Sequence, residues 1–493
     1  MEYFTDNVES QTIELAVLDT LSSFSNIPFI YHFENTTADK NDLFMPTDVL
    51  RVTFYKALLE FPILAGHLHM GYDGRASVVI DRNNLNLPEY RESTCDVHFD
   101  QLKAASYNWD MFPKDLVAVS VLTTVGVDGV IKLANFHCAR LRDNSGMLIF
   151  ANMSHYVVDG VGFCAFMGRW AEYCQLACSK VGAVLQHHEF TFDRNIINKM
   201  LSFKRRPISD AASHLFFVHR LAASALAWIS PILRGRILSA FLSMSKAEAH
   251  MFHISRDRLE ALRSSLVDYI PSDMRLSDND LIASLASMTI VNGLNRKSNS
   301  NGGVLGRLKA ACGRFLGGLL GKDTTEHITF LIADTRHRLG IGESRYTGNC
   351  VIPQLVINPL QRMAAPITSE THAHVACRVR AAVQDFDRPY ISQFIDTLNK
   401  HPSSFAQPLV YTISHPEKVF ITNQSRFPLY DLDYGFGTPA WVSPVPISAI
   451  NFVKVMPVHP SQTGYNIHMT TTAYAMSNVL CNSSWQKLAT LIF

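Results

Sequence analysis

The chain has 493 residues, of which 47% are hydrophobic and 18% are charged. This length and composition predict a globular protein of two or three packed units, and they exclude a fibrous, disordered or disulfide-stapled chain. The 44 Lys and Arg residues nearly balance the 43 Asp and Glu residues, which leaves a net charge of +1. No whole-protein field attracts a polyanion, so nucleic acid is not expected as a partner.

The cysteines and the chain ends indicate a cytoplasmic protein. Nine cysteines without a Cys-x-x-Cys pair predict buried free thiols in a reducing compartment. The first residues carry acids where a signal peptide needs a basic and then an apolar region. Residues 490–493 match neither a peroxisomal tripeptide nor a prenylation box.

The first quarter of the chain predicts mixed helices and strands. An apolar pattern of helical spacing begins at a Thr47 cap and stops before Pro62, which indicates a helix. Short runs rich in Val and Leu predict strands at 78–80, 116–125 and 130–135. The last two of these strands are expected to form a hairpin.

A buried strand followed by an amphipathic helix comes next. Residues 147–153 are an uninterrupted apolar run, as in strands that are buried on both faces. After Gly160, large apolar residues recur three and four positions apart, which predicts a helix.

Residues 196–246 are predicted to connect two halves of the chain. They are Arg-rich and then strongly apolar, and their 13-residue charge-free stretch at 221–233 is shorter than the ~18 residues that a membrane-spanning helix needs. Beyond them, a cap at 277–280 predicts a helix and residues 328–333 predict a strand.

A glycine-rich segment at 302–322 mixes basic and apolar residues. Two interpretations stay open. The segment lies on a membrane surface or a hydrophobic partner, or it is a surface insertion that folds back on the protein.

The segment 155–160, HYVVDG, stands between the predicted buried strand and helix. Strand ends hold side chains rigidly where they can reach a cleft. His155 can take and return a proton near neutral pH, Asp159 can fix its geometry, and Gly160 allows a tight turn. Taken alone, the pattern is a weak signal and fits a core histidine that is satisfied by hydrogen bonds better than a catalytic one.

A second segment makes the pattern specific. Residues 430–439, YDLDYGFGTP, combined with HxxxDG, resemble the HxxxD and DFGWG motifs of the BAHD-type acyltransferases. Residues 334–339 and 346–349 look like that family's D-x-R-x-R and Y-x-G-N segments. Residues 420–428 are similar to its strand before DFGWG, and 61–68 to its FPxLAGRL segment. The style is closest to fungal members such as trichothecene O-acetyltransferases.

The resemblance implies a fold of two similar chloramphenicol-acetyltransferase-like α/β domains with an active-site channel between them. We expect an N-terminal domain at 1–195, a crossover linker at 196–246 and a C-terminal domain at 247–493. The implied co-substrate is acyl-CoA, the implied acceptor is a small hydroxylated molecule, and the family favours a monomer.

The family's roles are carried over to the matching residues. His155 would be the general base that deprotonates the acceptor hydroxyl and then protonates the departing CoA sulfur. Asp159 would pair with Arg336 and play a structural part. Thr422 and Gln424 stand where plant relatives have a Thr and a Trp suited to binding the oxyanion, and Thr422 is the firmer assignment because Gln replaces Trp.

The DFGWG-like motif is expected to be structural. Asp433, Gly435 and Gly437 are retained, while Tyr434 and Phe436 replace the family's Phe and Trp. Because ring replaces ring, no loss of activity is inferred.

Other chemistries have weaker support. No cluster of Cys or carboxylates accompanies the closely spaced histidine pairs, so no functional metal is expected. The paired histidines are His67 and His69, His187 and His188, and His372 and His374. Glycine-rich stretches lack the Lys-Ser/Thr of a phosphate loop.

The first functional hypothesis is a CoA-dependent O-acyltransferase for a hydrophobic secondary metabolite, terpenoid or glycolipid. One alternative is a condensation-type enzyme that uses a carrier-protein thioester, although Ser154 stands where such proteins have a second histidine. Another is a non-catalytic binding relative, which the retained His155, Asp159, Gly160 and Thr422 argue against.

Overall fold

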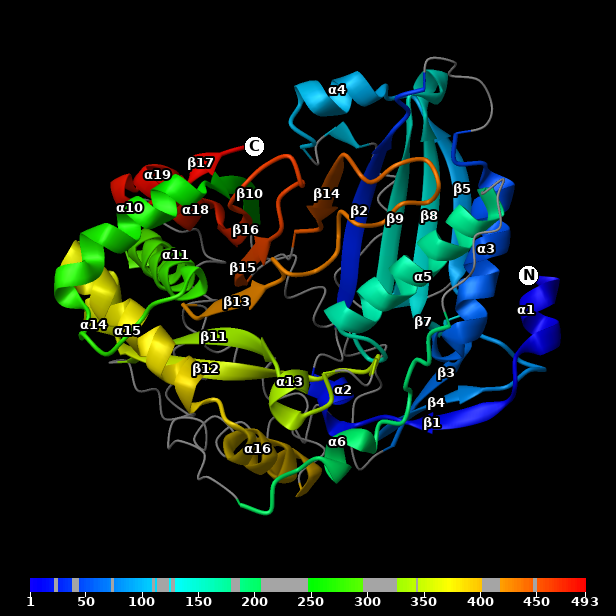
Figure 1. Ribbon diagram of the computed structural model, residues 1–493, viewed down its shortest axis with the longest axis horizontal. Helices are drawn as coiled ribbons and strands as arrows, with labels where there is room; N and C mark the ends of the chain where they lie inside the picture. The colour runs from blue at the N-terminus through cyan, green and yellow to red at the C-terminus, as the bar shows by residue number, and fades with distance from the viewer. Residues whose placement is uncertain are drawn as a thin grey trace, which may run out of the picture.

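The computed structural model describes most of the chain, and within it two large sheets carry the helices (Figure 1). The described residues are 1–21, 25–37, 44–71, 75–108, 111–112, 124–125, 129–178, 187–204, 247–295, 326–342, 345–400, 417–446 and 450–493. Most of the predicted strand at 116–125 (residues 116–123), most of the predicted linker (205–246) and the glycine-rich segment at 302–322 lie outside them.

The first large sheet has five strands in the order β14-β2-β9-β8-β5. β5 and β8 are parallel, and the other neighbours are antiparallel. The bounds are β2 Asn26–Glu34, β5 Glu89–Cys95, β8 Ala134–Leu141, β9 Gly146–Ser154 and β14 Trp441–Pro444. One face is covered by two helices, α3 (Thr47–Glu60) and α5 (Gly160–Cys178). A strand from the C-terminal part of the chain therefore completes this sheet.

Smaller elements complete the described N-terminal part of the chain. A three-stranded sheet has the order β1-β4-β3, and β6 pairs with β7. These strands are β1 Gln11–Glu14, β3 His67–Met70, β4 Ala76–Ile80, β6 Thr124–Val125 and β7 Ile131–Lys132. The short helices are α1 Glu2–Asn7, α2 Val17–Leu21, η1 Pro62–Ala65, α4 Phe99–Ala104, η3 Arg142–Asn144 and α6 Ile196–Lys199.

The second large sheet has seven strands in the order β12-β11-β13-β15-β16-β10-β17. Its strands are β10 Ala247–Ile254, β11 Glu326–Asp334, β12 Val351–Pro359, β13 Val419–Asn423, β15 Asn451–Met456, β16 Tyr465–Thr472 and β17 Thr490–Leu491. The helices of this half are α10 Arg256–Leu266, η4 Val267–Tyr269, α11 Asp278–Asn295, α13 Arg336–Leu339, α14 Leu360–Ala364, α15 Ser369–Asp385, α16 Arg388–Lys400, α18 Ala473–Leu480 and α19 Ser483–Leu488. Both halves thus have the α/β character that the sequence predicts.

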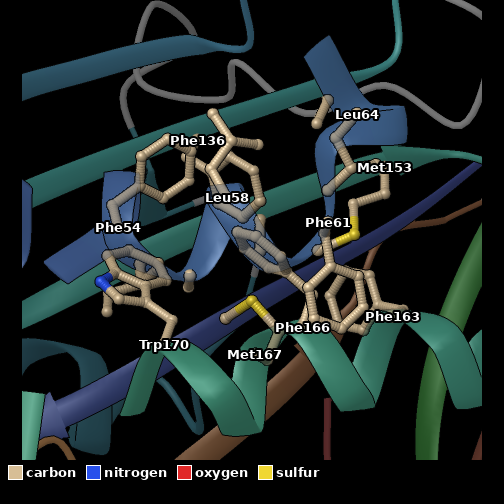
Figure 2. Packing of buried hydrophobic residues seen from close by; sticks show 14 of the residues in the cluster. Phe54, Leu58, Phe61, Leu64, Phe136, Met153, Phe163, Phe166, Met167 and Trp170 are labelled. Carbon is tan, nitrogen blue, oxygen red and sulfur yellow. The ribbon is translucent and has the colours of Figure 1, made fainter. Parts of the chain in front are cut away.

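An aromatic cluster joins α3 and α5 to the first sheet (Figure 2). Phe54 is fully buried, and its ring centroid lies 4.9 Å from that of Phe136 and 5.4 Å from that of Trp170. Centroid separations of 4.5–7 Å with tilted or edge-on rings are the favourable arrangement for aromatic pairs. The packing fixes the position of α5, which begins at the segment that carries His155.

Several local predictions are confirmed. Every residue of β9 is buried, α5 begins at Gly160, and the side chain of Ser277 accepts a hydrogen bond from the Asp280 N–H at the start of α11. The predicted Thr47 cap is wrong. Pro46 is the N-cap residue of α3 and no side chain caps the helix, because the extended chain ends at Pro46 and Thr47 is already helical.

The expectation of buried cysteines is only partly right. The described residues include eight cysteines, and all eight are free thiols. The buried ones are Cys95, Cys138, Cys174 and Cys350, and Cys481 is exposed because it follows the last turn of α18 at the surface. None of the helices in the described ranges is long and apolar enough to span a bilayer.

Candidate active site

His155 lies in a short turn between β9, which ends at Ser154, and α5, which begins at Gly160. The second half of the molecule approaches this turn closely. A Cβ atom on Gly160 would lie 2.3 Å from the ring of Phe427, which follows β13. A larger residue at 160 would force the Phe427 ring to move, so the close contact between Phe427 and the histidine turn depends on Gly160.

The imidazole of His155 is oriented by Asn349. The His155 Nδ1 lies 2.7 Å from the Asn349 Oδ1, and the Asn349 Nδ2 donates to the His155 carbonyl at 2.8 Å. An amide oxygen can only accept, so Nδ1 carries the proton and Nε2 keeps its lone pair. Nε2 has no hydrogen-bond partner among the described residues.

A buried carboxylate holds Asn349 in turn. The Asp19 Oδ1 accepts from the Asn349 backbone N–H at 2.9 Å and from its Nδ2 at 2.8 Å. Because a carboxylate oxygen accepts only, the contact fixes which end of the amide faces His155. The Arg194 Nε lies 3.3 Å from the Asp19 Oδ2, so the carboxylate is balanced by a buried cation.

No role for Asp19, Arg194 or Asn349 was predicted from the sequence. Asn349 is the last residue of the Y-x-G-N segment, and that motif is the sequence feature that could have identified it. Asp19 lies in the short helix α2, where no motif marks it.

Burial keeps His155 neutral. Desolvation lowers the pKa of the His155 imidazole below its ordinary value of 6.5, although the Asp159 charge and the Asn349 hydrogen bond act in the opposite direction. The ring is therefore unprotonated at Nε2 near neutral pH. An unprotonated, oriented imidazole is suited to accept a proton.

Asp159 pairs with Arg336, as predicted. The Arg336 guanidinium donates from Nη1 to the Asp159 Oδ2 at 2.7 Å and from Nη2 to Oδ1 at 2.9 Å. Asp159 also accepts backbone N–H groups of Val161, Gly162 and Cys350. Five donors occupy the carboxylate, and it makes no hydrogen bond to His155, so its observed contacts are structural.

Arg336 holds the segment 345–350 against the histidine turn. Its Nη2 donates to the Gly348 carbonyl at 2.7 Å and to the Tyr346 carbonyl at 3.2 Å. A Cβ atom on Gly162 would lie 2.1 Å from the Thr347 carbonyl oxygen. The absence of that Cβ allows the close approach that places Asn349 beside His155.

Thr422 and Gln424 lie at the end of β13, in the second half. Thr422 is partly buried and is paired in register with Ile332 on β11 and Lys454 on β15. The Gln424 backbone N–H donates to the Val455 carbonyl at 2.7 Å, while its side-chain Oε1 is buried without a partner among the described residues. Among the described residues, no hydrogen bond joins the side chain of Thr422 or of Gln424 to His155.

The DFGWG-like motif forms a tight loop around Asp433. The Asp433 Oδ1 accepts the N–H groups of Gly435 at 2.7 Å, Phe436 at 3.1 Å and Gly437 at 3.0 Å. Gly435 and Gly437 have φ values of 91° and 97°, which favour glycine. The buried Tyr434 ring packs edge-on against Trp170 of α5, so the loop supports the helix that follows the histidine turn.

Metal ligands do not gather in the described part of the chain. It contains no group of three or more His, Cys, Asp and Glu residues with metal-binding geometry. His372 contacts the hydroxyl of Ser284 at 2.8 Å, and His188 contacts Glu172.

Comparison with known proteins gives a consistent set of relatives. A family model described as the Transferase family matches residues 5–217 and 319–483. Putrescine hydroxycinnamoyltransferase 1 of Oryza sativa subsp. japonica is 22% identical over 453 residues, which cover 90% of this chain and 88% of that protein.

Solved structures share the fold at low sequence identity. TRI101 of F. sporotrichioides, complexed with coenzyme A and T-2, has a TM-score of 0.71 and 15% identity, covering 98% of this chain and 100% of that one. TRI101 of F. graminearum, complexed with coenzyme A and deoxynivalenol, has a TM-score of 0.69, 13% identity and the same coverage. Vinorine synthase has a TM-score of 0.62 and 13% identity, with coverage of 96% and 94%.

The Asp159–Arg336 pair generates a stability prediction. Asp159→Ala and Arg336→Ala should each lower the free energy of unfolding by about 3–5 kcal/mol, because each leaves a buried charge without its partner. The double variant should lose less than the sum of the two. Urea denaturation followed by circular dichroism measures all three.

The exposed pair of Arg51 and Glu92 supplies the control for this experiment. Glu92→Gln should change the free energy of unfolding by no more than about 1 kcal/mol. If Asp159→Ala and Arg336→Ala unfolded at the same urea concentration as the parent, the buried pair would have no stabilising role.

Proposed function

The chain belongs to the Transferase family, that of the BAHD-type acyltransferases, and we propose that it transfers an acyl group from acyl-CoA to a hydroxyl of a hydrophobic small molecule. Two relatives that share its fold bind coenzyme A together with T-2 or deoxynivalenol. The observation that carries the proposal is the His155 imidazole, whose Nδ1 is held by Asn349 and whose Nε2 lone pair has no described partner.

The reaction requires one base and no covalent acyl-enzyme. The His155 Nε2 takes the proton of the acceptor hydroxyl while the hydroxyl oxygen attacks the thioester carbonyl carbon. The tetrahedral intermediate then collapses with cleavage of the carbon–sulfur bond. The imidazolium returns the proton to the CoA sulfur, so the products are the acyl ester and free CoA. A positioned base of this kind contributes typically 10²–10⁴-fold.

Thr422 is proposed to bind the oxyanion of the tetrahedral intermediate. Thr422 comes from the second sheet, and the proposal is supported by the contact of Gly160 with Phe427, which lies five residues after Thr422. Its hydroxyl is a donor, and the Gln424 amide nitrogen is a second candidate with a different reach. The substrates would then lie between the two sheets.

The proposal also covers the domain organisation of the chain, its location in the cell and the chemical class of the acceptor. We propose a domain division at 1–195, 196–246 and 247–493, a monomeric state, and a place in the cytoplasm with peripheral contact to a membrane. The acceptor class would be a secondary metabolite or glycolipid. The basic and apolar character of residues 302–322 is what supports a lipid-like acceptor.

His155→Ala tests the proposed function directly. The variant should lose turnover by about 10²-fold or more while its melting temperature stays that of the parent, since the imidazole supplies the base. Release of free CoA thiol from a panel of acyl-CoAs and hydroxylated acceptors measures turnover. His69→Ala, an exposed histidine on β3, is the matched control. A folded His155→Ala variant with parental turnover would refute the role of His155.

Asn349→Ala tests the orientation of the imidazole. The expected result is a kcat about 10²-fold lower at nearly unchanged KM, because the ring loses its fixed tautomer. The acid limb of kcat/KM should lie below pH 6.5 in the parent, because activity is lost as pH falls through the lowered pKa of His155. The Asn349 hydrogen bond raises that pKa, so the limb of the variant should move to lower pH.

The control for that experiment is Asn399→Ala, at an exposed position on α16. It should keep both the parental kcat and the parental pH profile. An acid limb that stays in place in Asn349→Ala would mean that Asn349 has no influence on the titration of His155.

Thr422→Val removes the proposed oxyanion donor and keeps the shape of the side chain. The kcat should fall roughly 10²–10³-fold, because loss of one such donor has that effect in other enzymes. Thr12→Val, an exposed threonine on β1, provides the comparison. An unchanged kcat in Thr422→Val would argue against this assignment.

A further inference from the structure

Lys454 lies on the face of the second sheet that also carries Thr422. Its neighbours Val453 and Val455 point into the core beneath the helices, so the alternating pattern of a strand directs Lys454 to the opposite face. Lys454 is paired in register with Thr422 on β13 and with His468 on β16. Neighbouring strands are about 4.8 Å apart, so the lysine stands directly beside the proposed oxyanion donor.

The ammonium group of Lys454 reaches toward the first sheet. Its Nζ donates to the Val445 carbonyl at 3.2 Å, and Val445 directly follows β14, the strand that pairs with β2. The residue is only 5% exposed. Lys454 therefore lies between the two sheets, where the proposed function places the substrates.

Within the described ranges, the protein supplies no counter-ion for this lysine. Its hydrogen bond goes to a neutral carbonyl, and no described Asp or Glu carboxylate lies within 4.0 Å of Nζ. The adjacent His468 is no substitute, since burial and the Lys454 charge both lower the pKa of its imidazole and keep it neutral. A buried ammonium without an anion is costly.

Two further polar atoms near Lys454 are also buried without partners among the described residues. One is the Oγ1 of Thr470, which is fully buried and paired in register with Phe452, two positions before Lys454. The other is the Oε1 of Gln424, two positions after Thr422. Buried polar groups are nearly always hydrogen-bonded, so this side of the sheet has unused capacity for a polar ligand.

We propose that Lys454 binds a carboxylate of a substrate, carried either by the acyl group or by the acceptor, and so selects anionic substrates at the site next to Thr422. This inference rests on the proposed function, because it assumes that acyl-CoA and acceptor meet between the sheets. Hydrogen bonds that involve a charged group are the strong ones, and a carboxylate can also accept from Thr470.

The titration behaviour of the lysine agrees with this assignment. Burial lowers the pKa of Lys454 to about 7, because no described anion compensates for desolvation of the ammonium group. A carboxylate bound against Nζ would raise that pKa again and keep the lysine charged at neutral pH.

Equilibrium binding to the full-length protein tests the proposal in two arms. The first arm compares succinyl-CoA with butyryl-CoA, which ends in a methyl group instead of a carboxylate. The second arm compares 4-(hydroxymethyl)benzoate with its methyl ester, in the presence of free CoA. No turnover occurs in either arm, because one substrate is always missing, so the result does not depend on the proposed catalytic role of His155.

The expected result is that the carboxylate member of at least one pair binds about tenfold or more tightly to the parent. Lys454→Met, which keeps the length and apolar stem of the side chain, should bring the ratio within that pair to near one. The arm that responds identifies the substrate that carries the carboxylate. Lys487→Met, at an exposed lysine on α19, should leave the ratio unchanged.

Three outcomes would overturn the proposal. They are a parent without preference in either arm, a preference that Lys454→Met retains, and an equal loss of affinity for both members of a pair. Thermal melting of Lys454→Met accompanies the titrations. If that variant is unfolded, Lys454→Gln replaces it and is judged by the same ratios.

Discussion

The buried ion pair between Asp159 and Arg336 is the constraint on which the site depends. Asp159 belongs to the turn before α5, and Arg336 begins α13 in the other half of the molecule. Each charge would be costly alone in this environment, so the pair ties the two halves together beside the histidine turn. Burial alone would lower the pKa of the Arg336 guanidinium, but the Asp159 charge raises it above its usual value. The same guanidinium donates to the Tyr346 and Gly348 carbonyls, which helps to hold Asn349 beside His155.

Once Asn349 is in place, the state of the histidine follows from ordinary hydrogen-bond chemistry. Asp19 accepts from the Asn349 amide, so the amide must present its oxygen to the imidazole. The Nδ1 proton is thereby fixed and Nε2 keeps its lone pair, while burial lowers the pKa of the ring and favours its neutral form. This arrangement orients a histidine through a neutral amide, with the carboxylate one step removed. In the proposed reaction, the imidazolium would therefore have no direct anion at Nδ1, which would favour return of its proton to the leaving sulfur.

Local patterns in the sequence predicted local structure well. The apolar run of β9 and the helical spacing of α5 depend on neighbours along the chain, and both were found as expected. The pairing of Asp159 with Arg336 could be predicted because the resemblance to a family supplied a relation between distant positions. No such relation marked Asp19, which contacts Asn349 from 330 positions away, or Lys454, whose place beside Thr422 depends on strand order. Contacts of this kind arise from the arrangement of the sheets, and neither periodicity nor spacing encodes that arrangement.

The electrostatics of the molecule favour local selection of a charged substrate. With 44 basic and 43 acidic residues, the net charge of +1 does not attract anions to the molecule as a whole, so individual charged groups near the site gain importance for discrimination. A buried ammonium between two sheets is effective in that role because its surroundings strengthen each charge interaction. The same burial disfavours the empty, charged state, which sets the lysine near the point of losing its proton. Under the proposed role of Lys454, a bound carboxylate would form the ion pair and also raise the pKa of the lysine, whereas a neutral substrate would leave that pKa low.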